Sequence, residues 1–387
     1  MTSTTAEKPI AFFDMKAQQA LIRADIDRRI AAVLDSGRFV VGPEVIELEE
    51  KLAAYTGAAH AVGVSSGTDA LQIAMMAEDI GPGDAVFLPA FTYTATAEVP
   101  LVLGATPVFV DVEESTFNID LADLRRRVAL IKAEGKLRPR AVVGVDLYGR
   151  AADWPGILKL CAEEGMFALD DAAQAFGGAL GNKRLGAWAH ATACSFYPTK
   201  TLGCYGDGGA ILTDDAEKAE LYRSLRQHGE GKSRYEVLRT GMNGRLDTIQ
   251  AAVLLAKLPL LEDELAARDR VATQYAARLG GAVKTPATLP DGVHAWGIYS
   301  ILLDSEAQRT RVQAAMQARG VPSAIYYPRP LHHQPAYAPK LAACLAGGPP
   351  ALPVSEDLCQ RILCLPMHPY LDAGQVDRVA DAVLAGL

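Results

Sequence analysis

Between about residues 60 and 215 of this 387-residue chain, short apolar runs alternate with longer stretches of helical periodicity. The runs are apolar on both faces, which is typical of strands buried in a mostly parallel sheet. Alternation of such strands with helices predicts an α/β sandwich, a sheet covered by helices on both sides. We expect strands at residues 61–65, 85–88, 107–112, 141–147, 166–169, 192–196 and 210–213.

The pattern changes after about Asp247, where alanine and leucine recur at helical spacing over residues 248–279. A proline-interrupted strand region and two further helical stretches complete the chain. We predict a large domain over residues 12–250 and a smaller α+β domain over residues 251–387, with the long helix linking them. A chain of this length commonly divides in this way.

Charge and composition exclude several classes of protein. The net charge is -8 and no basic block occurs, so a nucleic-acid partner is not expected. Apolar runs are short and the first nine residues are polar, which predicts a cytoplasmic protein with neither a membrane span nor a signal peptide. The six cysteines are scattered without a C-x-x-C pair, which argues against a disulfide framework or a bound metal.

A small, glycine-containing turn follows the first expected strand. Its residues Ser65, Ser66, Gly67, Thr68 and Asp69 open a helix, and backbone N–H groups at the positive end of a helix can hold a phosphate. The turn has neither the lysine of a P-loop nor the glycine spacing of a dinucleotide-binding loop. Ordinary capping of the helix by Ser66 or Thr68 is the alternative.

Two acidic residues, Asp170 and Asp171, stand at the end of the strand expected at residues 166–169, and Gln174 follows them. The carboxyl edge of an open α/β sheet is where such folds bind ligands. A carboxylate at this edge can hold a proton on a heterocyclic nitrogen. Capping of a helix N-terminus is equally consistent with the pattern.

A single lysine, Lys200, lies among apolar and small residues just after the strand expected at 192–196. Burial would lower its pKa by desolvation and favour the neutral amine, which Schiff-base lysines require. The alternative is a lysine whose charged end reaches solvent. Several glycines crowd the following positions, which predicts a tight bend or a close backbone approach. These are Gly203, Gly206, Gly208 and Gly209.

The phosphate-binding turn, the acid and the lysine occur in the order found in fold-type I pyridoxal-phosphate (PLP) enzymes. Over nearly its whole length the chain resembles the sugar aminotransferases of the DegT/StrS family. The resemblance is carried by residues 66–71, 89–93, 171–174, 195–200, 206–209 and 243–246. It implies a fold-type I PLP-dependent transferase that acts as a homodimer with shared active sites.

The resemblance also implies roles for individual residues. Lys200 would bind the cofactor and move protons, and Asp171 would pair with the pyridine nitrogen. The remaining cofactor contacts would be Gly67, Thr68 and Ser195 at the phosphate, Tyr93 on the ring face, Gln174 at the ring hydroxyl, and Asn243 from the neighbouring subunit. The cofactor would alternate between PLP and its amino form, pyridoxamine phosphate, with glutamate as amino donor.

The amino acceptor implied by the resemblance is a sugar nucleotide. Residues 14–19, 326–332 and 365–370 resemble family members that act on 3-keto sugars, especially those that make UDP-2-acetamido-3-amino-2,3-dideoxyglucuronate for bacterial surface polysaccharide such as lipopolysaccharide O-antigen. That group often has His-Tyr where this chain has Tyr326-Tyr327, so a dTDP-linked 3-keto-6-deoxyhexose and a 4-keto sugar remain alternatives. The implied substrate contacts are Gly37, Phe39, Thr199, Arg245, Tyr326, Tyr327 and His332.

Three other classes of protein use a similar fold. Dehydratases of the family lack the lysine, whereas Lys200 is present here. Regulators built on the fold usually carry a separate DNA-binding segment, for which we see no candidate. A cysteine desulfurase needs a cysteine on a mobile loop, and Cys344, in a stretch rich in glycine and proline, is the one loose candidate.

Overall fold

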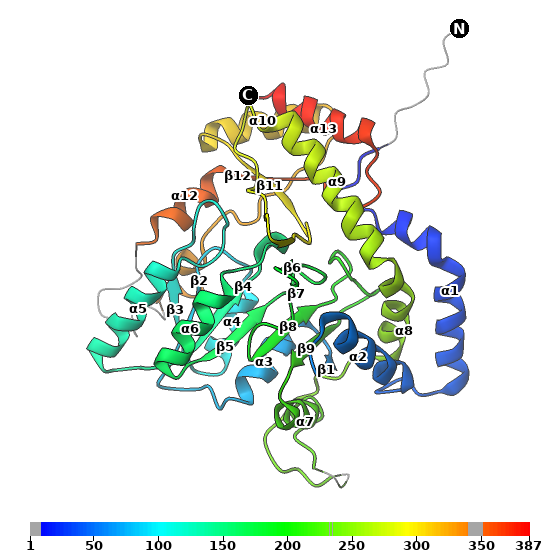
Figure 1. Cartoon of the computed structure of the whole chain (residues 1–387), viewed down its shortest axis with the longest axis vertical. Coiled ribbons are helices and arrows are strands. Elements are labelled where there is room, and N and C mark those ends of the chain that lie inside the picture. Colours follow the sequence, from blue (N-terminus) through cyan, green and yellow to red (C-terminus); the bar gives the residue numbers. More distant parts are fainter. Residues whose placement is uncertain (1–8, 232, 234, 340–350) are drawn as a thin grey trace.

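The computed structural model describes residues 9–231, 233, 235–339 and 351–387, so Cys344 lies outside the described residues. Within them the centre is a seven-stranded sheet in the order β1-β9-β8-β5-β4-β2-β3 (Figure 1). Its strands are β1 (His60–Val64), β2 (Asp84–Pro89), β3 (Thr106–Val110), β4 (Arg138–Val145), β5 (Phe167–Asp171), β8 (Ala191–Ser195) and β9 (Gly209–Thr213). Neighbouring strands are parallel except at β9, which is antiparallel to β1 and β8. The predicted mostly parallel sheet is confirmed.

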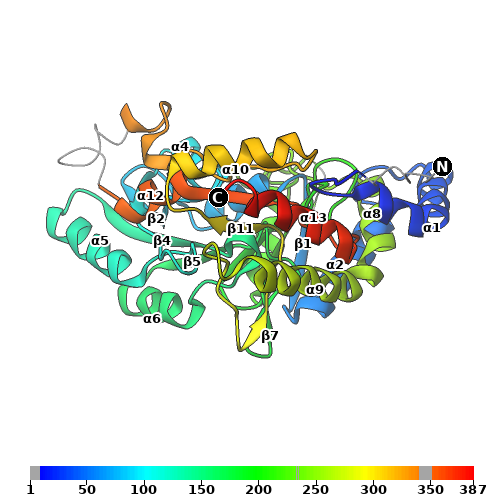
Figure 2. The ribbon, with the colours of Figure 1, turned by 90° about the horizontal axis from the view of Figure 1, so that it is seen from above.

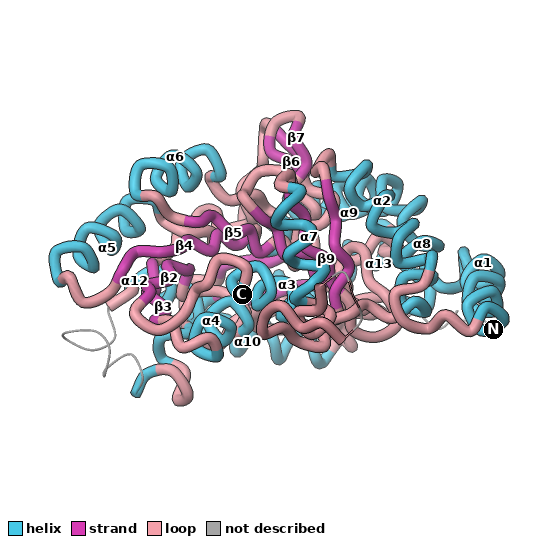
Figure 3. The backbone as a smooth tube through the Cα atoms, turned by 90° about the horizontal axis from the view of Figure 1, so that it is seen from below, coloured by secondary structure: helices cyan, strands magenta, loops and turns pink. Residues whose placement is uncertain are grey.

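Helices cover both faces of this sheet (Figure 3). On one face Val86 and Leu88 share a core with α3 (Gly67–Met76), α4 (Ala95–Val102) and α7 (Ala216–Leu225). On the other face their strand neighbours Ala85 and Phe87 pack with α5 (Leu121–Glu134) and α6 (Trp154–Glu164). Successive strand residues point to opposite faces, so both faces need apolar side chains. The α/β sandwich predicted from these runs is confirmed.

A second core lies above one end of the sheet (Figure 2). It is built from the antiparallel pair β11 (Tyr299–Leu302) and β12 (Ile362–Leu365) together with α9 (Leu261–Leu279), α10 (Glu306–Ala318) and α13 (Ala373–Leu384). Ile10 packs into this core from the other end of the sequence. Leu331 and Leu352 instead pack into the core of the central sheet. Residues from each side of residue 250 therefore pack into the core on the other side, and the division into two domains at this point stays a prediction.

The stretch expected to form one long helix is interrupted. It consists of α8 (Thr248–Lys257), the short 3-10 helix η2 (Leu258–Leu260) and α9. Pro259 accounts for the break, since it lacks a backbone N–H and its ring crowds the preceding turn of an α-helix. Helices α1 (Met15–Ser36) and α2 (Pro43–Thr56) both pack against α8 at the edge of the molecule (Figure 1).

The remaining described elements are short. A small sheet joins β6 (Ala179–Leu180), β7 (Lys183–Arg184) and β10 (Gly292–Val293), whose two-residue strands show no periodicity in a sequence. The others are η1 (Leu147–Gly149), η3 (Leu331–His333) and α12 (Pro353–Arg361). None of the helices in the described ranges is long and apolar enough to cross a membrane. The cysteines in those ranges are buried free thiols.

Candidate active site

A cavity of about 440 Å³ opens at the carboxyl ends of the parallel strands. Its walls come from the segments that follow β1, β2, β5 and β8, and from the chain between β11 and α12. This edge is where ligands bind in open α/β sheets. The cavity brings together ten of the residues expected from the sequence: Gly67, Thr68, Tyr93, Asp171, Gln174, Ser195, Thr199, Lys200, Tyr326 and Tyr327.

One end of the cavity is the N-terminus of α3. Ser66 caps this helix, accepting the N–H of Asp69 at 3.0 Å, so the capping expected as an alternative does occur. Gly67 and Thr68 form the first turn and line the cavity together with Ser195. A Cβ atom on Gly67 would lie only 2.7 Å from Cβ of Ser195. Glycine therefore allows the positive end of the helix to lie directly against the end of β8, as a phosphate-binding turn requires.

Asp171 ends β5 and projects into the cavity wall, whereas its neighbour Asp170 does not line the cavity. Its Oδ2 accepts a hydrogen bond of 2.8 Å from Oγ1 of Thr96, and its Oδ1 accepts the N–H of Ala173 at 3.3 Å. Burial raises the pKa of Asp171, while these two donors and the charge of Lys200 act in the opposite direction. The carboxylate is thus partly satisfied and still faces the cavity.

Lys200 lies on the tight loop between β8 and β9. The loop is closed by backbone hydrogen bonds from Lys200 N to the Tyr197 carbonyl at 2.9 Å and from Cys204 N to the Phe196 carbonyl at 2.8 Å. The buried ammonium of Lys257, in α8, donates to the Gly203 carbonyl at 2.6 Å and so ties the loop to that helix. Burial lowers the pKa of Lys200, and the nearby carboxylate of Asp171 opposes this effect. The predicted environment of a reactive amine is present.

The predicted close approach near the glycine cluster is also present. A Cβ on Gly209 would lie 2.5 Å from the carbonyl carbon of Ser66. The first residue of β9 therefore packs directly on the residue that caps α3. No larger side chain fits there without moving the two segments apart.

The opposite wall of the cavity is aromatic. Gln174 is fixed between two tyrosines, because its Oε1 accepts the N–H of Tyr148 at 2.8 Å and its Nε2 donates to the hydroxyl of Tyr327 at 3.1 Å. The Tyr148 hydroxyl donates to the carbonyl of Tyr326. Tyr93 is 58% exposed at the mouth, with its ring centre 6.4 Å from that of Tyr327. Such a wall suits a flat heterocycle and a polar ligand beside it.

Four predicted residues lie outside this cavity on the surface of the chain: Gly37, Phe39, Asn243 and Arg245. Gly37 ends α1, and the carbonyl of Phe39 accepts the N–H of Thr248 at 3.0 Å, just beyond Arg245. An isolated bridge between Val40 and Asp247 joins the same two segments. Residues 37–40 and 243–248 therefore lie side by side. We call their exposed and half-exposed part the surface strip, namely residues 37–40, Asn243, Arg245 and Asp247. Phe39 and Val40 are about half exposed, at 48% and 52%.

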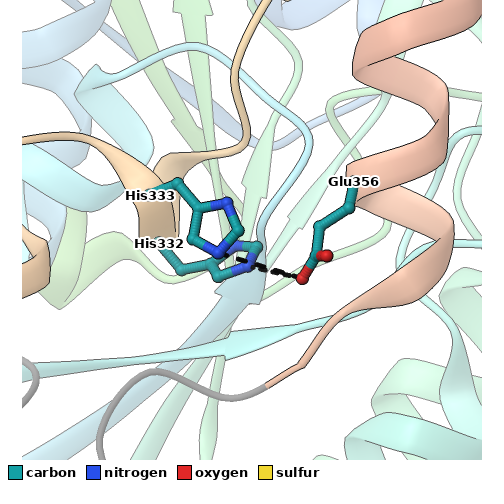
Figure 4. A group of neighbouring side chains, drawn as sticks. All are labelled: His332, His333 and Glu356. Carbon is teal, nitrogen blue, oxygen red and sulfur yellow. Dashed lines mark hydrogen bonds and ion pairs between the residues drawn. The ribbon is translucent and has the colours of Figure 1, made fainter.

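His332 is the one expected substrate contact that is fully buried and does not line the cavity. Figure 4 shows it beside His333 and Glu356. Its Nε2 lies 3.2 Å from Oε1 of Glu356, and its ring packs near Phe109. Nitrogen and oxygen atoms of His332, His333 and Glu356 lie within 4.8 Å of one another, yet Glu356 Oε1 also accepts the Leu352 N–H at 3.1 Å. We interpret this group as a hydrogen-bonded brace between η3 and α12. His332 does not line the cavity, and its Nε2 faces Glu356, so its expected contact with the substrate stays a prediction.

Sequence reasoning missed two residues that organise the cavity. Thr96 holds Asp171, and Tyr148 holds both Gln174 and Tyr326. Neither carries a signal that could have revealed it, because a threonine inside a helix and a tyrosine after a strand are common. The role of Thr96 becomes visible only in the folded chain, where it meets Asp171, a residue 75 positions away in the sequence.

Comparison with known proteins identifies the family. Residues 20–384 match the model of the DegT/DnrJ/EryC1/StrS aminotransferase family. The chain belongs to this family. A UDP-2-acetamido-2-deoxy-3-oxo-D-glucuronate aminotransferase of Pseudomonas aeruginosa is 42% identical over 97% of this chain and 99% of that protein. A dTDP-3-amino-3,4,6-trideoxy-alpha-D-glucose transaminase of Streptomyces venezuelae is 39% identical over 98% of this chain and 97% of that protein.

Solved structures agree with this membership. An aminotransferase of the family from Brucella abortus superimposes with a TM-score of 0.93, with 46% sequence identity over 97% of this chain and 99% of that one. A Bacillus subtilis relative, with 27% identity and a TM-score of 0.85 over 98% of this chain and 86% of that one, was solved with pyridoxamine phosphate bound. The chain of 387 residues described here is therefore a PLP-dependent aminotransferase of fold type I.

The cavity fits that cofactor. A helix N-terminus with Ser195 beside it suits the phosphate, and a buried carboxylate at Asp171 suits a protonated ring nitrogen. Lys200 is an amine with a lowered pKa on the same cavity wall. The cavity therefore contains a partner for the phosphate, the ring nitrogen and the aldehyde of PLP.

Proposed function

We propose that this aminotransferase transfers an amino group from glutamate to a nucleotide-linked 3-keto sugar that resembles UDP-2-acetamido-2-deoxy-3-oxo-glucuronate. The observation that carries the proposal is the convergence of Lys200, Asp171 and the α3 N-terminus on one cavity. The sugar is proposed from the P. aeruginosa relative, which aligns over nearly the full length of both chains. Surface polysaccharide synthesis in the cytoplasm would be the setting of such a reaction.

Each residue of the cavity has a proposed task. PLP, when bound, supplies an electron sink for the carbon that loses or gains a proton. Asp171 favours the protonated ring nitrogen, since an adjacent carboxylate stabilises a cation. Lys200 holds the cofactor at rest and moves protons as a general acid and base once its amine is released. Gly67, Thr68 and Ser195 bind the phosphate, Tyr93 covers the ring, and Gln174 contacts the ring hydroxyl.

The substrate would occupy the part of the cavity nearest Thr199, Tyr326 and Tyr327. One site serves both the donor and the acceptor, so the two substrates bind in turn and ping-pong kinetics are expected. A sugar nucleotide is larger than glutamate and needs a wide opening to the cavity. The exposed ring of Tyr93 lies at this opening.

A panel of acceptors tests the proposed substrate. The enzyme would be incubated with PLP, glutamate and UDP- or dTDP-linked keto sugars, and aminated products would be identified by mass. We expect the UDP-linked 3-keto uronate to have the highest kcat/KM. Preference for a dTDP-linked 3-keto sugar would support the alternative represented by the S. venezuelae relative. Amination of a 4-keto sugar alone would contradict the proposal.

We further propose that the enzyme is a homodimer in which the surface strip enters the cavity of the partner. Asn243 would reach the cofactor phosphate of the partner and Arg245 its sugar nucleotide, with Gly37 and Phe39 beside them. Support comes from the position of these residues on one strip outside their own cavity. Half-exposed Phe39 and Val40 give the strip an apolar component, as an interface requires.

Mixed dimers distinguish a contact across the interface from one within the chain. Lys200→Ala inactivates its own site, whereas Asn243→Ala would damage the site of the partner. Mixing and reassembling the two inactive variants should restore activity, because one site of each hybrid then has both Lys200 and Asn243. No restoration, with hybrids demonstrated by differently tagged subunits, would place Asn243 in its own site and contradict the shared arrangement.

A further inference from the structure

Two buried carboxyl groups lie directly behind the cavity and have no role in the reaction described above. Asp170 and Asp146 are both fully buried. Asp170 precedes Asp171 on β5, so the two side chains point to opposite faces of the sheet. Asp146 follows β4, the parallel neighbour of β5, and its backbone N–H donates to the Asp171 carbonyl at 3.2 Å. Both groups therefore border the backbone that presents Asp171.

The donors around the pair are unequal. Oδ1 of Asp146 accepts the N–H of Ala152 at 2.7 Å and the indole N–H of Trp154 at 3.0 Å. Oδ2 of Asp170 receives only the hydroxyl of Thr192, at 3.3 Å. Asp146 Oδ2 and Asp170 Oδ1 are buried and have no hydrogen-bond partner among the described residues. Gly144 pairs with Asp170 across the two strands, so Asp146, two residues further on, faces the same side of the sheet as Asp170.

A hydrogen bond between two carboxyl groups requires a proton, since ionised carboxylates only accept. Burial raises the pKa of Asp146 to about 7, although its two N–H donors stabilise the negative charge. Asp170 has one weak donor and two acidic neighbours, Asp146 and Asp171. Burial, followed by these two charges, raises the pKa of Asp170 well above its usual value. The buried thiol of Cys194 on β8 is a further neighbour, and burial, followed by the acidic neighbour Asp170, raises its pKa. The proton therefore belongs on Asp170.

We propose that Asp170 is a positioning residue that works as a neutral carboxylic acid, donating its proton in a hydrogen bond to Asp146. This bond ties the end of β4 to the end of β5. Asp146 leads directly into η1, where Tyr148 holds Gln174 and Tyr326 in the cavity wall. The neutral acid also keeps a further negative charge away from Asp171. The role in catalysis rests on the proposed pairing of Asp171 with the cofactor, whereas the protonation does not.

Infrared spectroscopy of the cofactor-free protein tests the protonation separately from the function. The wild type at pH 8 should show the carbonyl band of a buried, protonated carboxylic acid, with a shift in D₂O. Asp170→Asn should remove this band, and the exposed-site control Asp263→Asn should keep it. Asp171→Asn should also keep it, which separates Asp170 from its neighbour. A spectrum unchanged by Asp170→Asn would overturn the proposal, whatever the enzyme's substrate.

Rescue by the isosteric amide tests the positioning. The amide introduced by Asp170→Asn can donate to Asp146 as the acid does, whereas the methyl group introduced by Asp170→Ala cannot. We expect Asp170→Ala to lose more than about tenfold in kcat, about 1.4 kcal/mol of barrier, with an altered pH profile. Asp170→Asn should recover most of this loss and keep the wild-type pH profile. Equal losses in the two variants, with both folded as judged by circular dichroism, would show that the donated hydrogen bond does not matter.

Discussion

Thr96 Oγ1 lies 2.8 Å from Oδ2 of Asp171 and donates a hydrogen bond to it within the buried wall of the cavity. The bond joins the first turn of α4 to the last residue of β5. It stabilises the charged form of a carboxylate whose pKa burial raises. Thr96 therefore influences the protonation state of the residue proposed to pair with the cofactor.

Thr96→Val should make Asp171 harder to ionise. Removing the donor raises the pKa of Asp171 further, so the acid limb of the kcat/KM profile should move to higher pH. The loss at neutral pH should be about 1.5–3 kcal/mol of transition-state stabilisation, the range for a hydrogen bond to a charged group. Thr96→Ser keeps the hydroxyl and serves as the matched control. A profile that does not move in the valine variant would remove Thr96 from the site.

Lys200→Ala should abolish turnover and the visible absorbance of the bound cofactor while leaving the fold intact. The exposed Lys159→Ala is the control for loss of a lysine. Borohydride reduction followed by peptide mass spectrometry locates the attachment in the wild type. Finding the cofactor on any other lysine would contradict the assignment.

Asp171→Asn should reduce kcat by several kcal/mol of transition-state stabilisation, the scale of a charged group in a buried site. An amide cannot hold the positive ring nitrogen as a carboxylate does. Asp170→Asn is the matched control on the preceding residue and should cost much less. Equal or greater damage at Asp170 would reverse the assignment of the two acids.

Arg245→Ala should separate the two half-reactions. We expect the glutamate half-reaction to remain nearly intact and the sugar half-reaction to lose about 1.5–3 kcal/mol, because a guanidinium can grip a carboxylate or phosphate with two hydrogen bonds. Stopped-flow absorbance of the cofactor measures each half separately, and the surface variant Arg125→Ala is the control. A variant that is less stable but has an unchanged sugar half-reaction would indicate an ion pair at the start of α8.

Asp170→Asn should also change how stability depends on pH. A carboxyl group whose pKa is raised on folding takes up protons when the chain folds, so its burial costs more as pH rises above the usual value of 3.8. Asparagine has no such cost. The free energy of unfolding of the variant, relative to wild type, should therefore increase between about pH 4 and pH 8. Urea unfolding across this range measures it, and a constant difference would show that Asp170 does not bind the proton.

The central sheet could be predicted from the amino-acid sequence alone, because runs that are apolar on both faces are stable only when helices cover both sides. The meeting of Lys200, Asp171 and Gly67 at one cavity could be predicted as well, since each follows a strand and so reaches the same sheet edge. The single helix expected over 248–279 was wrong at Pro259, where the ring breaks the helical hydrogen bonding.

Which side chains meet became clear only from the tertiary structure. His332 is buried against Glu356, and Asn243 and Arg245 lie on a surface strip instead of in their own cavity. The fold also brings Thr96 to Asp171 and Asp146 to Asp170. The physical reason is that periodicity records which face of a segment is buried, whereas a hydrogen bond between distant segments depends on how strands are ordered in the sheet, and this order leaves no local pattern in the sequence.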